Sequence, residues 1–160
     1  MLSKALSFEK LNNIRDLEGM NAADGQVIAD NCFIRSGHLE DLSEKDKEKL
    51  KNIVCMIIDF RSDGERAEKP DAIIDGISYV HLPVVDDLTA GITRETEADR
   101  NAFGTLALKP EEAKKYMCGM YRAFAGDNAT RRYAEFIHII SKSRIKRFFG
   151  IAPQERTGRG

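Results

Sequence analysis

A continuous apolar run constrains the fold of this chain more than any other feature. The run extends from Ile53 to Ile58 and ends at Asp59. Its length suits a strand, and the absence of alternating polar residues predicts that both faces are buried, as in a parallel sheet. Phe60–Glu65 follows this run, at the carboxyl end of the predicted strand, where α/β folds place their sites. Ile77–Val84 is predicted as a second core strand.

Helix signals lie between and after these strands. Ser43, followed by an acid at Asp46, predicts the N-cap of a short helix. Pro110 begins a second predicted helix, and residues 130–141 form a third after a break at Gly126. Apolar residues at helical spacing predict that both later helices have a core face, made of Met117, Met120, Tyr121, Phe124, Tyr133, Phe136, Ile137 and Ile140. The alternation of strands and helices predicts one α/β domain over residues 1–160, with a mostly parallel central sheet flanked by helices.

Shorter features complete this picture. Gln26–Ile28 and Cys32–Arg35 are predicted as strands of a small ribbon, after a turn at Asp24-Gly25. Asp87–Leu108 is polar and aperiodic, which predicts a mobile loop or lid over a site.

Composition excludes several classes of function. The 25 basic residues nearly balance the 26 acidic ones, so no strong field favours nucleic acid or an anionic membrane. No apolar run approaches the roughly 20 residues of a membrane span, and residues 1–12 do not resemble a signal peptide, so we expect a cytoplasmic protein. The three cysteines, Cys32, Cys55 and Cys118, predict neither a disulfide framework nor a zinc site, and are expected to be buried thiols. No metal or other cofactor is expected.

The C-terminal stretch suggests a phosphate site. An apolar run at Phe148–Ile151 precedes Arg156-Thr157-Gly158, which predicts a strand that turns through a tight loop into a helix. Backbone N–H groups of such a loop, and the positive end of a helix, converge on a point that suits an anion. No Cys, Ser or Asp lies between Phe148 and Arg156. The loop as written is therefore able to hold a phosphate but has no group to attack one.

Cys55 and Arg61 have the spacing of a Cys-x5-Arg phosphatase loop. In such a loop a thiolate attacks phosphorus, and the Arg binds two phosphate oxygens. The residues between them begin Met56-Ile57-Ile58, with no glycine to adopt the positive φ angles that a phosphate cradle needs. We therefore interpret Cys55 as a residue of the core strand.

An ordered series of short motifs resembles a known family. The series runs Ile14-Arg15-Asp16-Leu17-Glu18-Gly19, Phe33-Ile34-Arg35-Ser36-Gly37, Ile57-Ile58-Asp59-Phe60-Arg61-Ser62, Lys69-Pro70-Asp71 and Tyr79-Val80-His81-Leu82-Pro83. Together these motifs resemble the bacterial tyrosine phosphatases that carry N-F-R-D-L-G-G, Y-R-S-G, I-D-L-R-S-x-x-E and a terminal H-C-x-x-G-K-D-R-T-G loop. The resemblance covers nearly the whole chain. The sequence departs from the family pattern in the terminal loop.

The resemblance assigns roles to the residues of the loop. Gly150 stands at the position of the family's nucleophilic Cys, and Glu155 at that of its acid. The family's His falls on Phe149, and its Gly and Lys fall on Pro153 and Gln154. The expected phosphate-binding residues are Arg156, Thr157 and Gly158, with Asp59 and Arg61 bordering or bracing the site. Arg15, Asp16 and Arg35 are interpreted as structural.

The same resemblance implies a function. Intact relatives would hydrolyse the phosphate monoester of a phosphotyrosine protein, and of phosphoserine or a phosphoinositide as well. Because this chain lacks the Cys and ends soon after the loop, we expect an inactive, truncated domain. The alternatives are a catalytically dead module that binds a phosphorylated partner, and a fragment with no function.

A change of reading frame would explain the altered loop. With permitted codons for residues 141–155, the same bases read two positions later encode Lys-Lys-Pro-Asp-Lys-Ala-Val-Phe-Trp-His-Cys-Thr-Ala-Gly-Lys. Third bases, and the codon family of Ser and Arg, are free choices in this reading. It also explains Arg144, Lys146 and Arg147, three cations where a buried strand should be apolar. The hypothesis places one slip near Ser141-Lys142 and a second near Glu155.

Overall fold

The computed structural model describes residues 4–11, 13–21, 23–84, 110–143 and 148–151. The strands of these segments are β1 (Lys4–Ala5), β2 (Arg15–Asp16), β3 (Phe33–Ser36), β4 (Met56–Asp59), β5 (Ser78–His81) and β6 (Phe148–Ile151). The α-helices are α1 (Glu44–Ile53), α2 (Asp63–Glu68), α4 (Pro110–Phe124) and α5 (Asp127–Lys142), and Ala23–Gly25 forms a 3-10 turn.

The strands form one mixed sheet in the order β1-β2-β3-β6-β4-β5. The pairs β1–β2 and β2–β3 are antiparallel, whereas β3–β6, β6–β4 and β4–β5 are parallel. The last strand of the chain, β6, thus lies between β3 and β4, in the middle of the parallel part. This confirms the predicted α/β fold with a mostly parallel sheet.

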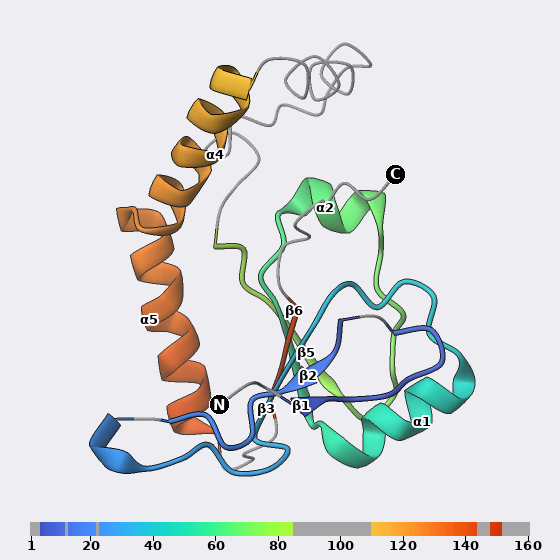
Figure 1. Ribbon diagram of the computed structural model, residues 1–160. Helices are drawn as coiled ribbons and strands as arrows, with labels where there is room; N and C mark the ends of the chain where they lie inside the picture. The colour runs from blue at the N-terminus through green and yellow to red at the C-terminus, as the bar shows by residue number, and fades with distance from the viewer. Residues whose placement is uncertain (1–3, 12, 22, 85–109, 144–147, 152–160) are drawn as a thin grey trace.

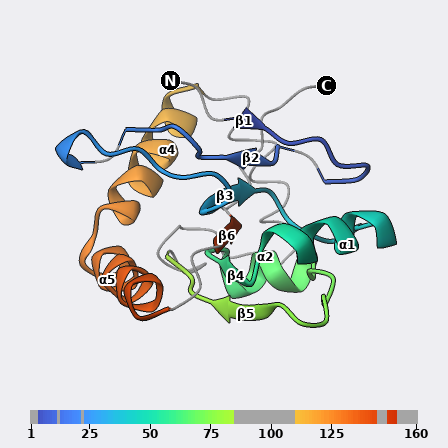
Figure 2. The ribbon, with the colours of Figure 1, turned by 90° about the horizontal axis from the view of Figure 1, so that it is seen from below.

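Helices cover the two faces of the sheet. The column formed by α4 and α5 lies on one side, and α1 and α2 lie on the other (Figures 1 and 2). Leu50 of α1 packs in one core cluster with Ile57 and Ile151. Phe136 of α5 packs on the other face, against Ile58. Because consecutive residues of β4 point to opposite faces, Ile57 and Ile58 serve different clusters, and both are buried as predicted.

The helix α1 has the predicted cap, but the strand after it is shorter than predicted. Ser43 Oγ accepts a hydrogen bond from the Asp46 amide, as an N-cap residue does. The helix continues to Ile53, and β4 begins only at Met56. Periodicity alone does not separate the end of a helix from the start of a strand when both are apolar.

One further strand prediction was wrong, and another was confirmed only in part. Val27 forms only an isolated bridge with Asn21, and its side chain is 60% exposed. The strand predicted over Ile77–Val84 is reduced to β5, which lies at the edge of the sheet and is largely half-buried or exposed. Its buried neighbours Leu82 and Val84 follow the strand rather than belong to it.

The helix α5 begins earlier than predicted, with Gly126 as its N-cap. The apolar faces of α4 and α5 are only partly in the core. Phe124, Phe136 and Ile140 are half-buried, as predicted. In contrast, Met117, Tyr121, Tyr133 and Ile137 are exposed large apolar residues. The prediction of a continuous core stripe was wrong for these four, because helical spacing shows which residues share a face but not whether anything packs on it.

The cysteines also differ from expectation. All three are free thiols, but Cys32 and Cys55 are only half-buried and Cys118 is exposed. The predicted loop at Asp87–Leu108 lies outside the described residues. Among the described helices, none has the length and apolar character needed to cross a membrane.

Candidate active site at the carboxyl edge of the parallel strands

Four parallel strands end side by side at one edge of the sheet. Their last residues, in the order of the sheet, are Ser36 of β3, Ile151 of β6, Asp59 of β4 and His81 of β5. Because these residues are in register, their side chains leave the same face of the sheet. In open α/β sheets this edge is where ligands bind.

The central strand β6 places Gly150 one residue before this edge. Gly150 pairs with Arg35 on one side and with Ile58 on the other. A Cβ atom built on Gly150 would lie 3.4 Å from Cε2 of the Phe60 ring. Glu155, Arg156, Thr157 and Gly158 lie outside the described residues, so their expected roles remain predictions.

Asp59 and Arg61 form a buried ion pair where β4 ends. Arg61 Nη2 lies 2.9 Å from Asp59 Oδ2, and Arg61 Nε lies 3.0 Å from Asp59 Oδ1. The Arg61 side chain is 3% exposed and that of Asp59 is not exposed at all. Charges buried to this degree persist only when paired and hydrogen-bonded. The guanidinium is therefore directed into the fold, which agrees with bracing rather than with binding a substrate.

Asp71 and Tyr79 complete this group, although neither was singled out as a site residue from the sequence. Asp71 Oδ2 lies 2.6 Å from Arg61 Nη2. The Tyr79 hydroxyl lies 2.6 Å from Asp59 Oδ2 and 2.5 Å from Asp71 Oδ2. The only sequence signal was that Lys69-Pro70-Asp71 and the segment from Tyr79 belong to the ordered motifs. Pairing between these motifs requires the fold.

The charges of the group shift its pKa values. Burial would raise the pKa of Asp59, but hydrogen bonds from Arg61 and Tyr79 outweigh it and hold that pKa below its ordinary value. Burial would lower the pKa of Arg61, but the two carboxylates raise it. Burial, and the hydrogen bonds to both carboxylates, raise the pKa of Tyr79. The stable state thus has ionised Asp59 and Arg61 beside a neutral phenol.

Further contacts fix the loop between β4 and α2. The Arg61 carbonyl oxygen lies 2.8 Å from His81 Nε2, so this nitrogen carries the hydrogen. Ser62 caps α2 by accepting from the Glu65 amide, and the Glu65 carboxylate accepts from the Ser62 amide. Both ends of the segment 59–62 are therefore held.

Two polar atoms beside the edge make no hydrogen bond, although one of them, His38 Nδ1, lies 3.7 Å from Glu40 Oε2. Ser36 Oγ and His38 Nδ1 are buried and make no hydrogen bond with the described part of the chain. Ser36 is 2% exposed, so its hydroxyl is also withdrawn from water. Nε2 of His38 lies 3.5 Å from Lys69 Nζ. A buried hydroxyl without a partner is costly and is uncommon away from functional sites.

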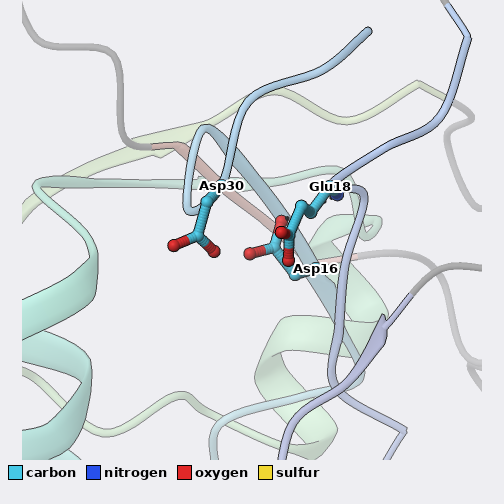
Figure 3. A group of neighbouring side chains, drawn as sticks. All are labelled: Asp16, Glu18 and Asp30. Carbon is cyan, nitrogen blue, oxygen red and sulfur yellow. Dashed lines mark hydrogen bonds between the residues drawn. The ribbon is translucent and has the colours of Figure 1, made fainter.

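Asp16 lies away from the edge and braces the N-terminal segments, as expected. The buried Asp16 carboxylate accepts hydrogen bonds from the Glu18 and Asn31 amides. It lies beside Glu18 and Asp30 (Figure 3), and one carboxylate oxygen from each of the three lies within 4.8 Å of the others. Glu18 also pairs with Lys4 Nζ at 3.0 Å. The contacts of Asp16 and Glu18 explain the positions of these two carboxylates without a bound metal ion.

Arg15 and Arg35 are paired neighbours on β2 and β3, and both are exposed. Cys55 precedes β4, whereas Arg61 follows it. The four residues of β4 span about 13 Å, so the two side chains leave opposite ends of one strand. They cannot share a phosphate loop.

Comparison with known proteins assigns the chain to a family. A model of the tyrosine phosphatase family matches residues 6–158. A protein of Cupriavidus necator, whose name assigns it provisionally to the tyrosine-protein phosphatases, is 31% identical over 105 residues. The aligned residues cover 61% of this chain and 38% of that relative. Since the family match extends over most of the sequence, the chain belongs to the tyrosine phosphatase family.

Proposed function

We propose that this chain carries the phosphate site of a protein-tyrosine phosphatase without its nucleophile, and that it does not hydrolyse phosphate esters. One observation carries the proposal. The central strand β6 ends at Ile151, at the carboxyl edge, and the sequence that follows it retains Arg156-Thr157-Gly158. The strand that precedes the loop is thus in the position that a ligand site of an α/β sheet requires.

The proposed chemistry follows from the residues of the loop. Arg156 would bind two phosphate oxygens through its planar guanidinium, and loop amides with Thr157 and Gly158 would complete the cradle. Glu155 would stand where the acid protonates the leaving oxygen. The covalent step needs a thiolate, and Gly150 has no side chain to supply one. Substrates of intact relatives would be phosphotyrosine proteins, with phosphoserine or a phosphoinositide as further substrates.

Asp59 and Arg61 have a supporting role in this proposal. Each donor nitrogen of the Arg61 side chain has a partner within the protein: Nε and Nη2 bind carboxylates, and Nη1 donates to the Lys69 carbonyl at 2.9 Å. We therefore assign the phosphate to Arg156 rather than to Arg61, which holds the end of β4. The free thiols suit a reducing compartment, and we propose the cytoplasm as the location.

The alternative is a module that binds a phosphorylated partner without turnover. It is favoured by the loss of the nucleophile together with the retention of Arg156. Against it, Pro153 removes one N–H from the loop and stiffens the turn. A fragment without function is the third possibility.

Hydrolysis and binding assays separate these possibilities. We expect no release of phenol from a chromogenic aryl phosphate above the blank, and turnover would contradict the proposal. Gly150→Cys alone should not rescue hydrolysis, because Pro153 and Gln154 remain in the loop. Saturable binding of a phosphotyrosine peptide, lost in Arg156→Ala but kept in the control Arg122→Ala, would support the binding module. Arg122 is an exposed residue of α4. Failure of the chain to fold would support the fragment.

The reading-frame hypothesis has its own test. Sequencing the gene across residues 141–160 decides whether a Cys codon exists out of frame across Ile151-Ala152. Its absence would refute the hypothesis. If it is present, we expect the chain translated in the corrected frame to hydrolyse the aryl phosphate, while the chain as written does not.

A further inference from the structure

We infer that Asp71 and Tyr79 are positioning residues for the end of β6, where the candidate phosphate site begins. Asp71 and Tyr79 hold the Asp59–Arg61 pair in place. This pair in turn fixes the backbone beside Ile151. The inference rests on the proposed function for the role of this edge. Its geometry, however, involves described residues only. The four residues Asp59, Arg61, Asp71 and Tyr79 are called the edge clamp below.

The edge clamp joins the strands on both sides of β6. Asp59 ends β4, and Tyr79 belongs to β5. Asp71 Oδ1 accepts a hydrogen bond of 2.7 Å from the amide of Leu39, which follows β3. Since β6 lies between β3 and β4, the clamp ties together the flanking elements at the point where β6 ends.

Within the clamp, both carboxylates depend on shared donors. Asp59 Oδ2 and Asp71 Oδ2 each contact Arg61 Nη2 and the Tyr79 hydroxyl. Two negative charges so close together are stable only while those donors stay between them. Arg66 adds a second, half-exposed cation, with Nε 3.5 Å from Asp59 Oδ2. The Tyr79 hydroxyl has a single hydrogen, which the two carboxylates share, so removing it takes away one of the donors that keep Asp59 and Asp71 together.

The clamp reaches β6 through Phe60. The Phe60 amide donates a 3.1 Å hydrogen bond to the Ile151 carbonyl oxygen. Phe60 lies between Asp59 and Arg61, whose side chains are both held by the clamp. Its ring also packs edge-on against Phe136, at 5.4 Å between centroids. The backbone of Phe60 is thus the physical link between the clamp and the last described residue of β6.

Amide hydrogen exchange measures this link directly. We expect Tyr79→Phe to speed exchange of the Phe60 amide about tenfold, the factor that corresponds to one weakened hydrogen bond to a charged group. The Thr130 amide, which donates to Gly126 in α5, should change less than about twofold. The matched control is Tyr133→Phe, at an exposed tyrosine of α5, and it should change neither amide.

Other outcomes would overturn the inference. Equal acceleration at Phe60 and Thr130 would mean a loss of global stability, and no acceleration at Phe60 would mean that the clamp does not act on β6. Asp71→Asn is a second variant that keeps the size of the side chain, and the same local acceleration is expected from it.

Phosphate binding separates this inference from the proposed function. Titration of inorganic phosphate into the wild-type chain should show binding that Tyr79→Phe weakens and Tyr133→Phe does not. If the wild type binds no phosphate, the proposed site is wrong, while the Phe60 exchange still decides whether the clamp positions β6. If phosphate binds equally to all three chains, the clamp does not position the site.

Discussion

At the scale of single residues, burial decides what a polar group does. Arg61 is an ordinary cation in the sequence, but its side-chain donors are all directed to carboxylates or a carbonyl in the structure. Ser36 shows the opposite case, because its hydroxyl is buried beside the candidate site and has no partner among the described residues. Arg61 stabilises the edge. The Ser36 hydroxyl lowers the stability of the edge unless a ligand or loop supplies a partner.

This contrast gives a prediction for two buried serines at the same edge. Ser36→Ala should raise the free energy of unfolding by up to about 1 kcal/mol, because a desolvated hydroxyl without a partner is removed. Ser62→Ala should lower it by about 1 kcal/mol, because α2 loses its N-cap. Urea denaturation of both variants measures the two effects. A clear loss of stability in Ser36→Ala would show that its hydroxyl is bonded in the folded chain.

At the scale of elements, the helices differ in what their apolar faces contact. In α5, Phe136 packs on the sheet, whereas its neighbour Ile137 is 56% exposed. Spacing alone assigned both residues to the core. Consecutive residues of an α-helix point in directions about 100° apart, so Phe136 and Ile140 face the sheet while Ile137, between them along the helix, does not.

The difference between these neighbours can be measured. Phe136→Ala should lower the free energy of unfolding by about 2–3 kcal/mol, since the ring leaves a cavity against Ile58 and Phe60. Ile137→Ala should change it by less than about 0.5 kcal/mol, as is usual for surface positions. Both variants place alanine in the same turn of α5, so helix propensity is matched. Equal losses in the two variants would show that the exposed stripe is covered in solution.

At the scale of the whole molecule, buried carboxylates connect distant segments. Asp46 of α1 accepts hydrogen bonds from the Glu9 and Lys10 amides, at 2.9 and 2.8 Å. Burial would raise the pKa of Asp46, but these amides and Ser43 outweigh it and lower that pKa. Asp59 has a lowered pKa for a similar reason. Two carboxylates therefore link ionisation to the stability of the fold.

The sign of the pH dependence follows from these shifts. A carboxylate with a lowered pKa in the folded chain contributes stability above its unfolded pKa of about 4, and loses it as the pH falls through the folded value. We expect the urea midpoint to be steady near neutral pH and to fall below about pH 4. Asp46→Asn should lower stability at pH 7 and flatten the acid dependence. An unchanged midpoint between about pH 6 and pH 3 would contradict this account.

The sequence alone determined the class of fold and the family. The buried run before Asp59, the Ser43 cap and the alternation of strands with helices are local signals, and each reports a local preference of the chain. The ordered motifs identified the family and led to the prediction that Gly150 stands at the position of its nucleophile. They did so because those features are carried by residue types at fixed spacing.

Only the tertiary structure decided which of these residues meet. Asp59 and Tyr79 are separated along the chain and meet because β4 and β5 are parallel neighbours, and Asp71 joins them from the segment that precedes β5. The central position of β6, between β3 and β4, likewise depends on pairing between strands that are far apart in sequence. Long-range pairing and the burial of individual side chains are properties of the assembled sheet, so no local pattern in the sequence encodes them.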